Sequence, residues 1–232
     1  MKSKSLKQLD LAITKCRLCP RLVEWREEVA VTKRKAYENE KYWGKPVPGF
    51  GPDNAELLIL GLAPGAHGAN RTGRVFTGDS SGDWLYRALH KAGLAKLPTS
   101  ENKTDGQELY KTRILCAVRC APPDNKPSNV ERDNCAPYFR NELELLEPTA
   151  KSILVLGNFA WTALFAQLGQ MGYSIPSPRP KFGHGIAVRL KRSNGKALTI
   201  VGSYHPSQQN TFTGKLTEKM LDSVVKKALS SS

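Results

Sequence analysis

A long glycine-rich loop that joins a short apolar run to a helix-like segment is the feature that most constrains this chain. The loop opens with Gly61-Leu62-Ala63-Pro64-Gly65, directly after the run Leu57–Leu60, and leads through Asp79 to a helical pattern at 84–91. A strand, a glycine-rich loop and a helix in this order present backbone groups to a ligand at the carboxyl edge of a parallel sheet. The loop lacks both the Gly-Lys-Ser/Thr ending of a P-loop and the GxGxxG spacing of a dinucleotide fold. This argues against a nucleoside triphosphate and against a dinucleotide as its ligand.

Four apolar runs predict the strands of a parallel sheet, because they are too far apart in the chain for simple hairpins and each precedes a loop or helical segment. This pattern is typical of an α/β fold with helices on both faces of the sheet. A further run at 186–190 is predicted to add a β-ribbon with a turn at Ser193-Asn194-Gly195. The four runs are Leu57–Leu60, Ile114–Val118, Ile153–Leu156 and Leu198–Val201.

Several helices carry readable ends. Gly93 is predicted to terminate a helix over 83–92. Ser128 and Glu131 form a capping-box pattern, but Pro137 follows, so we expect a break and a restart near Ala136. A last helix is expected at about 217–229. A chain of 232 residues can build one compact domain, expected to span 1–232 with a helical, cysteine-bearing segment at its N-terminus.

The charge balance indicates a polyanionic partner. The chain has 35 Lys and Arg against 21 Asp and Glu, a net charge of +14, and such a balance most often goes with nucleic acid. No apolar run approaches the roughly 18 residues of a membrane span. The N-terminus has no apolar signal-peptide core, so we expect a cytoplasmic protein.

Five cysteines in a chain of this kind indicate a metal or redox role more than disulfides. Cys16 and Cys19 form a CxxC pair, and Cys120 and Cys135 lie far downstream. Four thiolates can close a site on either Zn²⁺ or an iron–sulfur cluster, and the spacing alone leaves both open. Cys116, inside an apolar run, is predicted to stay outside the set.

Three polar residues have both a structural and a functional interpretation. His205 follows the fourth strand and could contact a ligand or cap a turn. Asp79 stands at the entry to a helix, where it could cap the helix or orient a water molecule. Asn125 could be a turn residue, or its amide could read the edge of a base.

Taken together, these motifs resemble the uracil-DNA glycosylase superfamily, and within it the family 5, or type B, enzymes of bacteria and archaea. The resemblance covers most of the chain. It rests on the CxxC pair, the connector at 42–51, the loop at 61–79, the run Arg119-Cys120-Ala121-Pro122-Pro123 and the run His205-Pro206-Ser207.

The resemblance implies a three-layer α/β/α sandwich around a four-stranded parallel sheet and a [4Fe-4S] cluster, which decides between iron and zinc. It also implies that a deaminated base is flipped into a pocket, where Phe76 stacks on it, Asn125 reads its edge and His205 stabilises the departing base. The backbone of Leu62, Ala63 and Pro64 would line this pocket. The implied cluster ligands are Cys16, Cys19, Cys120 and Cys135, and the expected DNA contacts are Arg71, Arg74, Lys126, Ser207 and Gln208.

Two departures from the wider superfamily matter. Leu62 and Ala63 occupy positions where many relatives carry the acidic or amide residue that handles the water, so Asp79 is our substitute for that role. The strand-end Asn that reads uracil in relatives falls near Cys116, which predicts a broader range that includes hypoxanthine.

The predicted function is excision of a deaminated base from DNA by hydrolysis of its N-glycosidic bond. The partner is DNA that contains uracil or another deaminated base, and the resemblance implies the nucleoid DNA of a prokaryote. We expect a monomer, and a sliding clamp is left open. The rival interpretation is a non-catalytic iron–sulfur or zinc module that binds nucleic acid. It suits the cysteines and the charge equally well but leaves the Asp79 and His205 loops unexplained.

Overall fold

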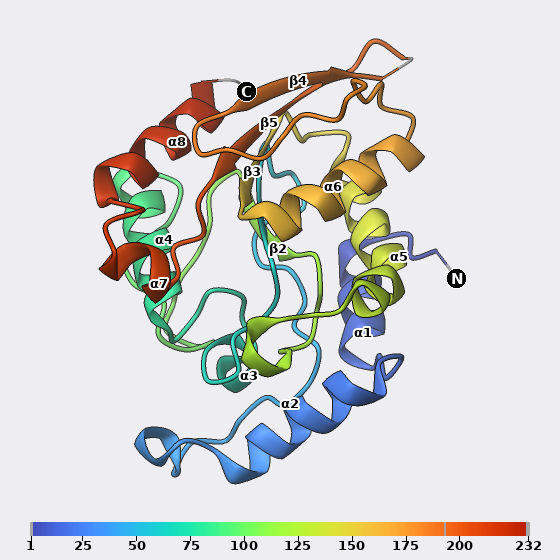
Figure 1. Ribbon diagram of the computed structural model, residues 1–232. Coiled ribbons are helices and arrows are strands. Elements are labelled where there is room, and N and C mark those ends of the chain that lie inside the picture. The colour runs from blue at the N-terminus through green and yellow to red at the C-terminus, as the bar shows by residue number, and fades with distance from the viewer. Residues whose placement is uncertain (1, 193, 231–232) are drawn as a thin grey trace.

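The computed structural model describes residues 2–192 and 194–230 and has a five-stranded sheet at its centre, in the order β2-β1-β3-β5-β4 (Figure 1). Strands β1 (Leu57–Gly61), β2 (Thr112–Cys116), β3 (Ser152–Leu156) and β5 (Ala197–Ser203) are parallel to their neighbours. The fifth strand, β4 (Ala187–Lys191), pairs antiparallel with β5.

The predicted sheet of four strands is therefore one strand short, although its four parallel members are confirmed. Strand β4 belongs to the β-ribbon that the run at 186–190 predicted. Asn194 and Gly195 lie in the turn of this ribbon, where the Gly195 N–H donates to the Arg192 carbonyl, whereas Ser193 lies outside the described residues.

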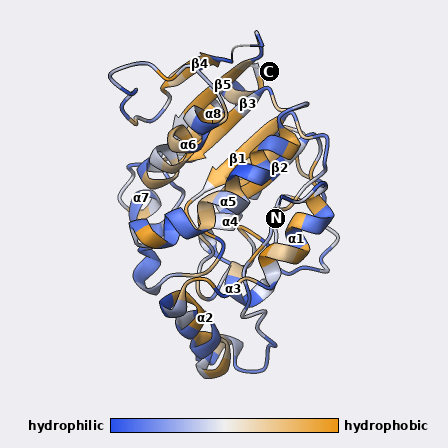
Figure 2. Ribbon diagram, turned by 90° about the vertical axis from the view of Figure 1, so that its right-hand side faces the viewer, coloured by the Kyte–Doolittle hydropathy of each residue, from blue (hydrophilic) through white to orange (hydrophobic). Residues whose placement is uncertain are grey.

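Helices cover both faces of the sheet, which confirms the three layers. Along β1, Leu58 and Leu60 pack in one core with α1 (Leu6–Thr14), α5 (Asn129–Leu146) and α6 (Asn158–Gln170). The alternating residues Leu57 and Ile59 pack in the other core with α4 (Ser80–Lys91) and α8 (Glu218–Ser230). Figure 2 shows the apolar sheet between helices whose outer sides are polar. None of the helices in the described part of the chain is long and apolar enough to cross a membrane.

The remaining helical segments gather mainly beyond the carboxyl ends of the parallel strands (Figure 1). They are α2 (Pro20–Thr32), η1 (Lys35–Tyr37), α3 (Ala69–Thr72), η2 (Pro123–Asn125) and α7 (Gln208–Phe212). The chain leaves β1 for β2 on one side and later places β3 on the other side of β1. Such a switch of direction opens a crevice at the carboxyl edge, where ligands of open α/β sheets bind.

The helix-end signals are confirmed at Asp79, Gly93 and Ser128, but the expected break at Pro137 is wrong. Helix α5 runs without interruption from Asn129 to Leu146. Pro137 and Asp133, whose carbonyl loses its helical partner, are both exposed, so water can satisfy that carbonyl. The opposite face stays anchored in the core by Phe139, Leu143 and Leu146.

Candidate active site

Phe76 is held in a strained conformation over the end of β1. Its φ of 50° lies in the left-handed region, which is costly for an aromatic residue and clusters at functional sites. The edge of its ring covers Gly61, where an added Cβ would come within 2.7 Å of the ring atom Cε2. Gly82 faces the Phe76 carbonyl at a distance that leaves no room for a Cβ. Both glycines are therefore required for this ring position.

The His205 side chain lies against Phe76, although 129 residues separate them in the chain. Their ring centroids are 5.7 Å apart and their planes differ by 29°, so the rings stack. Burial lowers the pKa of His205 to about 4, which keeps the imidazole neutral at physiological pH. The carbonyl of His205 accepts a hydrogen bond from Asn210 Nδ2 at 2.9 Å, which fixes the loop after β5.

Asp79 has the capping role that its position suggested, and its second oxygen lies beside the glycine-rich loop. One carboxylate oxygen, Oδ1, accepts the Gly82 N–H at 3.0 Å and caps α4. The other oxygen, Oδ2, faces the glycine-rich loop so closely that a Cβ on Gly68 would overlap it. Burial raises the pKa of Asp79, because a charged carboxylate loses hydration there. Because of this raised pKa, Oδ2 is a stronger base than an ordinary carboxylate oxygen, and it lies beside the glycine-rich loop.

The loop itself is braced from outside. Asn70 Nδ2 donates to the Arg26 carbonyl of α2 at 3.2 Å, and the Tyr42 hydroxyl and His67 Nδ1 share a hydrogen bond of 3.0 Å. The Leu62 carbonyl accepts the Val118 N–H, so the pairing of β1 with β2 continues beyond the strands. Leu62 and Ala63 are half-buried and Pro64 is buried, as the wall of a pocket requires.

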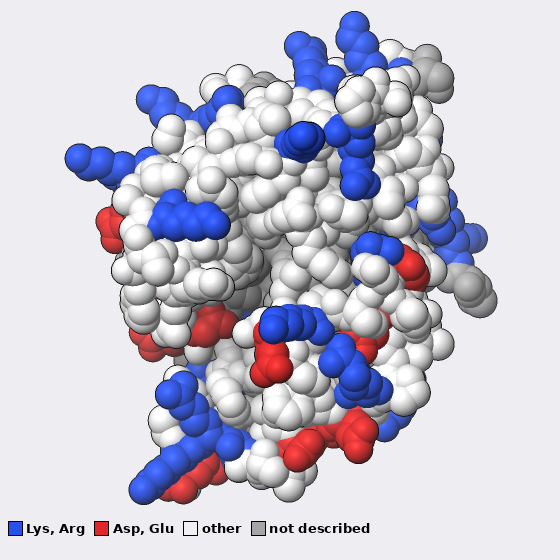
Figure 3. Space-filling model, in the orientation of Figure 1, with Lys and Arg blue, Asp and Glu red and all other residues white. Residues whose placement is uncertain are grey.

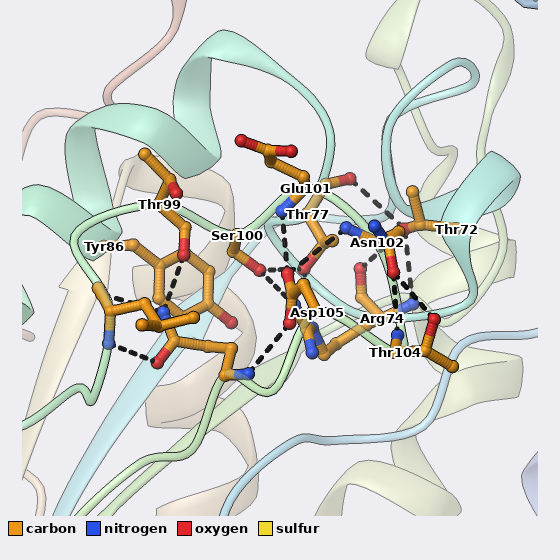
Figure 4. Close-up of polar contacts among 12 residues, drawn as sticks. Thr72, Arg74, Thr77, Tyr86, Thr99, Ser100, Glu101, Asn102, Thr104 and Asp105 are labelled. Atoms are coloured by element: carbon orange, nitrogen blue, oxygen red, sulfur yellow. Dashed lines mark hydrogen bonds and ion pairs between the residues drawn. The ribbon is translucent and has the colours of Figure 1, made fainter.

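Arg71 and Arg74, which the sequence suggested as DNA contacts, are buried braces. Arg71 is 7% exposed, pairs with Glu40 and donates to the carbonyls of His67 and Gly78. Arg74 is 4% exposed, and Figure 4 shows it inside a polar network in which it binds Asp105 at 2.5 Å and Ser100 at 2.6 Å. Because both guanidinium groups are withdrawn from solvent, this burial is evidence against a phosphate contact by either.

Asn125 is not brought to Phe76 or His205 by any described contact. It is exposed in η2 with a φ of 55°, a left-handed value that Asn tolerates better than most residues. Cys116 instead lies at the pocket end of β2, paired in register with Gly61. It is 1% exposed, and burial raises the pKa of its thiol to about 12.

One long segment of the chain, 148–217, contains eight Lys and Arg residues and no acidic residue. This excess of eight positive charges is more than half of the net charge of +14, and it lies in β4 and in the connecting segments around β3, α6 and β5. Figure 3 shows only Lys and Arg on the upper part of this face, above a hollow in its middle. The exposed residues of the expected DNA surface are Lys126 and Gln208, with Ser207 half-buried.

Sequence reasoning overlooked Phe212, which is 80% exposed at the end of α7, seven residues after His205. Its signal in the sequence was an apolar side chain among Gln, Asn and Thr in the His205 loop.

Four of the five cysteines line one cavity. Cys16 and Cys19 lie just before α2, Cys120 follows β2, and Cys135 lies in α5. Cys116 belongs to a different core, which confirms that it stands outside the set. The Arg26 side chain donates to Cys120 Sγ at 2.9 Å, and Asn134 donates to Cys19 Sγ at 3.5 Å. These donors are suited to thiolate sulfur.

The thiols around the cavity are a donor set that suits a metal centre. Within residues 2–192 and 194–230, no three His, Cys, Asp or Glu side chains converge closely enough to hold one ion. A tetrahedral zinc site needs its four sulfurs at about 2.3 Å from one point. Four cysteines that surround a shared cavity without converging on a point match the donor set of a [4Fe-4S] cluster.

Comparisons with known proteins agree with this geometry. A family model of the uracil DNA glycosylase superfamily matches residues 48–229. The chain is 50% identical to a type-5 uracil-DNA glycosylase of Mycobacterium tuberculosis, over 97% of this chain and 81% of that protein. It is 48% identical to a type-5 uracil-DNA glycosylase of Thermus thermophilus, over 93% of each. A type-4 uracil-DNA glycosylase of Pyrobaculum aerophilum is 28% identical over 72% of this chain.

Proposed function

Because the chain belongs to the uracil DNA glycosylase superfamily, we propose that it removes uracil from DNA by hydrolysing the N-glycosidic bond, which leaves an abasic site. The observation that carries this proposal is the stacking of His205 on Phe76 over the end of β1, with Asp79 beside Gly68 of the loop that follows β1. A buried base inside a duplex cannot reach such a site, so the nucleotide must be flipped out of the stack.

The flipped base stacks on Phe76 and meets the backbone of Leu62, Ala63 and Pro64. Stacking recognises any planar base, because every base has a π-face. The strained backbone of Phe76 holds its ring in place before the base arrives, so little ordering remains to be done on binding.

His205 stabilises the base as it leaves. Negative charge grows on the base oxygen as the C–N bond breaks, and a fixed donor at that oxygen lowers the barrier by roughly 3–4 kcal/mol. The lowered pKa keeps the imidazole of His205 neutral, and a neutral imidazole still has one N–H to donate to the base oxygen.

Asp79 positions the water that attacks the sugar. Its capped oxygen fixes the carboxylate, and its second oxygen accepts a proton from the water. The base leaves with the electrons of the C–N bond, and the oxocarbenium-like sugar that remains gains the water oxygen. The proton taken up by Asp79 then passes to the departed base or to solvent, which restores the carboxylate.

DNA is held by phosphate contacts from Lys126, Ser207 and Gln208, supported by the acid-free segment at 148–217. Phe212 supplies an exposed apolar wedge that fills the gap left by the flipped nucleotide. Asn125 is exposed and has no described contact with Phe76 or His205, and we assign it to reading of the base edge when DNA is bound.

A [4Fe-4S] cluster bound by Cys16, Cys19, Cys120 and Cys135 ties together α2, the segment after β2 and α5. When bound, it supplies a rigid cross-link that organises the segments facing DNA; the chemistry of excision belongs to the pocket.

The test is excision from labelled duplexes that carry U·G, U·A, hypoxanthine·T or no damage, with abasic sites cleaved by alkali. Wild type should release uracil and, by the breadth proposed for this pocket, hypoxanthine. The His205→Ala and Asp79→Ala variants should lose excision while retaining binding to the duplex. Tight DNA binding with no excision of any base by the wild type would instead favour the non-catalytic binding module.

A further inference from the structure

Two buried arginines line the four-cysteine cavity and have no role in the mechanism above. Arg26 comes from α2 and Arg119 from the segment between β2 and η2, and each is 2% exposed. Arginine is almost never buried to this extent without full pairing. Their presence beside the cysteines therefore calls for an anionic partner.

The contacts of Arg26 do not satisfy all of its hydrogen-bond donors. Nη1 donates to Cys120 Sγ at 2.9 Å, and Nη2 donates to the Cys16 carbonyl at 3.3 Å. Nε is buried and has no hydrogen-bond partner. The carboxylate of Glu27 is 3.6 Å from Nη2, but it is 44% exposed and also engaged by Arg17.

Arg119 is less satisfied still. Its Nη2 pairs with the buried Glu142, but Glu142 also pairs with Arg113, so one carboxylate faces two guanidinium groups. The Nε and Nη1 of Arg119 are both buried without a partner. Three guanidinium nitrogens of the two arginines that line the cavity are thus buried without a partner in the polypeptide alone, which destabilises the fold unless a bound group accepts their hydrogen bonds.

We propose that Arg26 and Arg119 are positioning residues for the iron–sulfur cluster. Their open N–H groups donate to the anionic cluster, and this stabilisation of its negative charge raises its reduction potential. This inference rests on the proposed cluster. A [4Fe-4S] core with four thiolates is anionic in both of its common states, and reduction adds one more negative charge. Cations and N–H donors beside the sulfurs favour the more negative state, which raises the potential.

Arg26 also connects the cluster to the base pocket. Its carbonyl accepts a hydrogen bond from the Asn70 side chain of the glycine-rich loop. Ala63 of that loop packs against the group of buried side chains that includes Cys19, Cys120 and Cys135. Removal of the cluster should therefore loosen α2 and the pocket wall together.

The test compares cluster properties, with activity set aside. Full-length wild type, Arg26→Met, Arg26→Lys and Arg119→Lys are prepared without oxygen, and iron, sulfide, the midpoint potential and the rate of bleaching in excess chelator are measured. Arg74→Met is the matched control, because Arg74 is equally buried and ion-paired but does not line the cavity.

We expect Arg26→Met to have a more negative midpoint potential and to bleach roughly tenfold faster or more, as for other outer-shell partners of metal sites. Arg26→Lys, which retains the charge, should fall between it and the wild type, and Arg74→Met should keep the wild-type potential. Arg119→Lys retains a charge for Glu142 and should also lower the potential. If Arg26→Met does not fold, the two lysine variants carry the test.

Unchanged potentials and bleaching rates in folded, loaded arginine variants would overturn this inference alone. A wild type that binds zinc, or that holds far fewer than about four iron atoms per chain, would overturn the cluster proposal and this inference together. The excision assay is independent of both outcomes, so a failure here leaves the glycosylase activity to be judged separately.

Discussion

Substitution of Asp79 by Asn separates the two roles of one carboxylate. Oδ1 caps α4 through the Gly82 N–H, and Oδ2 faces Gly68 of the pocket loop. Asn retains an oxygen for the cap, since Asn and Asp are equally good N-cap residues. It cannot accept a proton from water at neutral pH. The Asp79→Asn variant should therefore keep its fold and lose its chemistry.

The magnitudes follow from these contacts. Loss of a positioned general base costs about 10²- to 10⁴-fold in rate. The free energy of unfolding of Asp79→Asn at pH 7 should equal or exceed that of the wild type, because burial raises the pKa of Asp79 and the variant removes a buried charge. Asp79→Ala, which also loses the cap, should unfold about 1 kcal/mol more easily.

The assay is single-turnover excision of uracil from a U·G duplex, combined with chemical denaturation of each variant. Ser5→Ala is the matched control, because it removes the side-chain N-cap of α1, a helix with no part in the proposed DNA and base contacts, and it should cost stability with no loss of rate. Full single-turnover excision by Asp79→Asn would refute the assignment. A loss of rate in Ser5→Ala equal to that in Asp79→Ala would show that lost helix capping, and not lost chemistry, explains the effect.

Three further outcomes are expected. Gly68→Ala should reduce excision at least tenfold in the single-turnover assay, since its Cβ would displace Asp79 Oδ2, whereas Gly93→Ala, at an open helix end, should not. Burial lowers the pKa of His205 to about 4 from 6.5, so on acidification the imidazole takes up a proton in the unfolded chain at a higher pH than in the folded one. Acidification from pH 6.5 to 4 should therefore lower the free energy of unfolding of the wild type more than that of His205→Gln, as measured by denaturation curves. Lys126→Ala should reduce the salt dependence of DNA binding by about one phosphate contact, whereas Arg74→Met, buried in the Asp105 network, should reduce stability and leave the salt slope unchanged; equal slopes in all three proteins would contradict the Lys126 contact.

Features with a local cause could be predicted from the sequence. The apolar runs define the parallel strands because both faces of the sheet are buried, and the caps at Asp79 and Ser128 follow from side-chain bonds to nearby N–H groups. The separation of Cys116 from the other cysteines follows from its place inside a strand.

Features that depend on tertiary context could not. Whether a helix can continue through Pro137 depends on which side of α5 faces water, and the sequence pattern does not show this. Arg71 and Arg74 look like surface cations, and only the fold places Glu40 and Asp105 beside them. The open N–H groups of Arg26 and Arg119 are likewise invisible until α2 and the segment after β2 meet at the cysteines.

The residue at the end of β2 gives a physical reason for the substrate breadth that we propose beside uracil excision. The strand-end position of β2 carries the thiol of Cys116, whose pKa of about 12 keeps it neutral, and a thiol is a weak hydrogen-bond donor. A thiol cannot offer the paired donor and acceptor with which a carboxamide distinguishes one base edge from another. Recognition then falls to Phe76 and to backbone groups, which accept different planar bases. Discrimination against normal bases must come from the flipping step, because a mispaired or deaminated base leaves the stack at lower cost than a paired one.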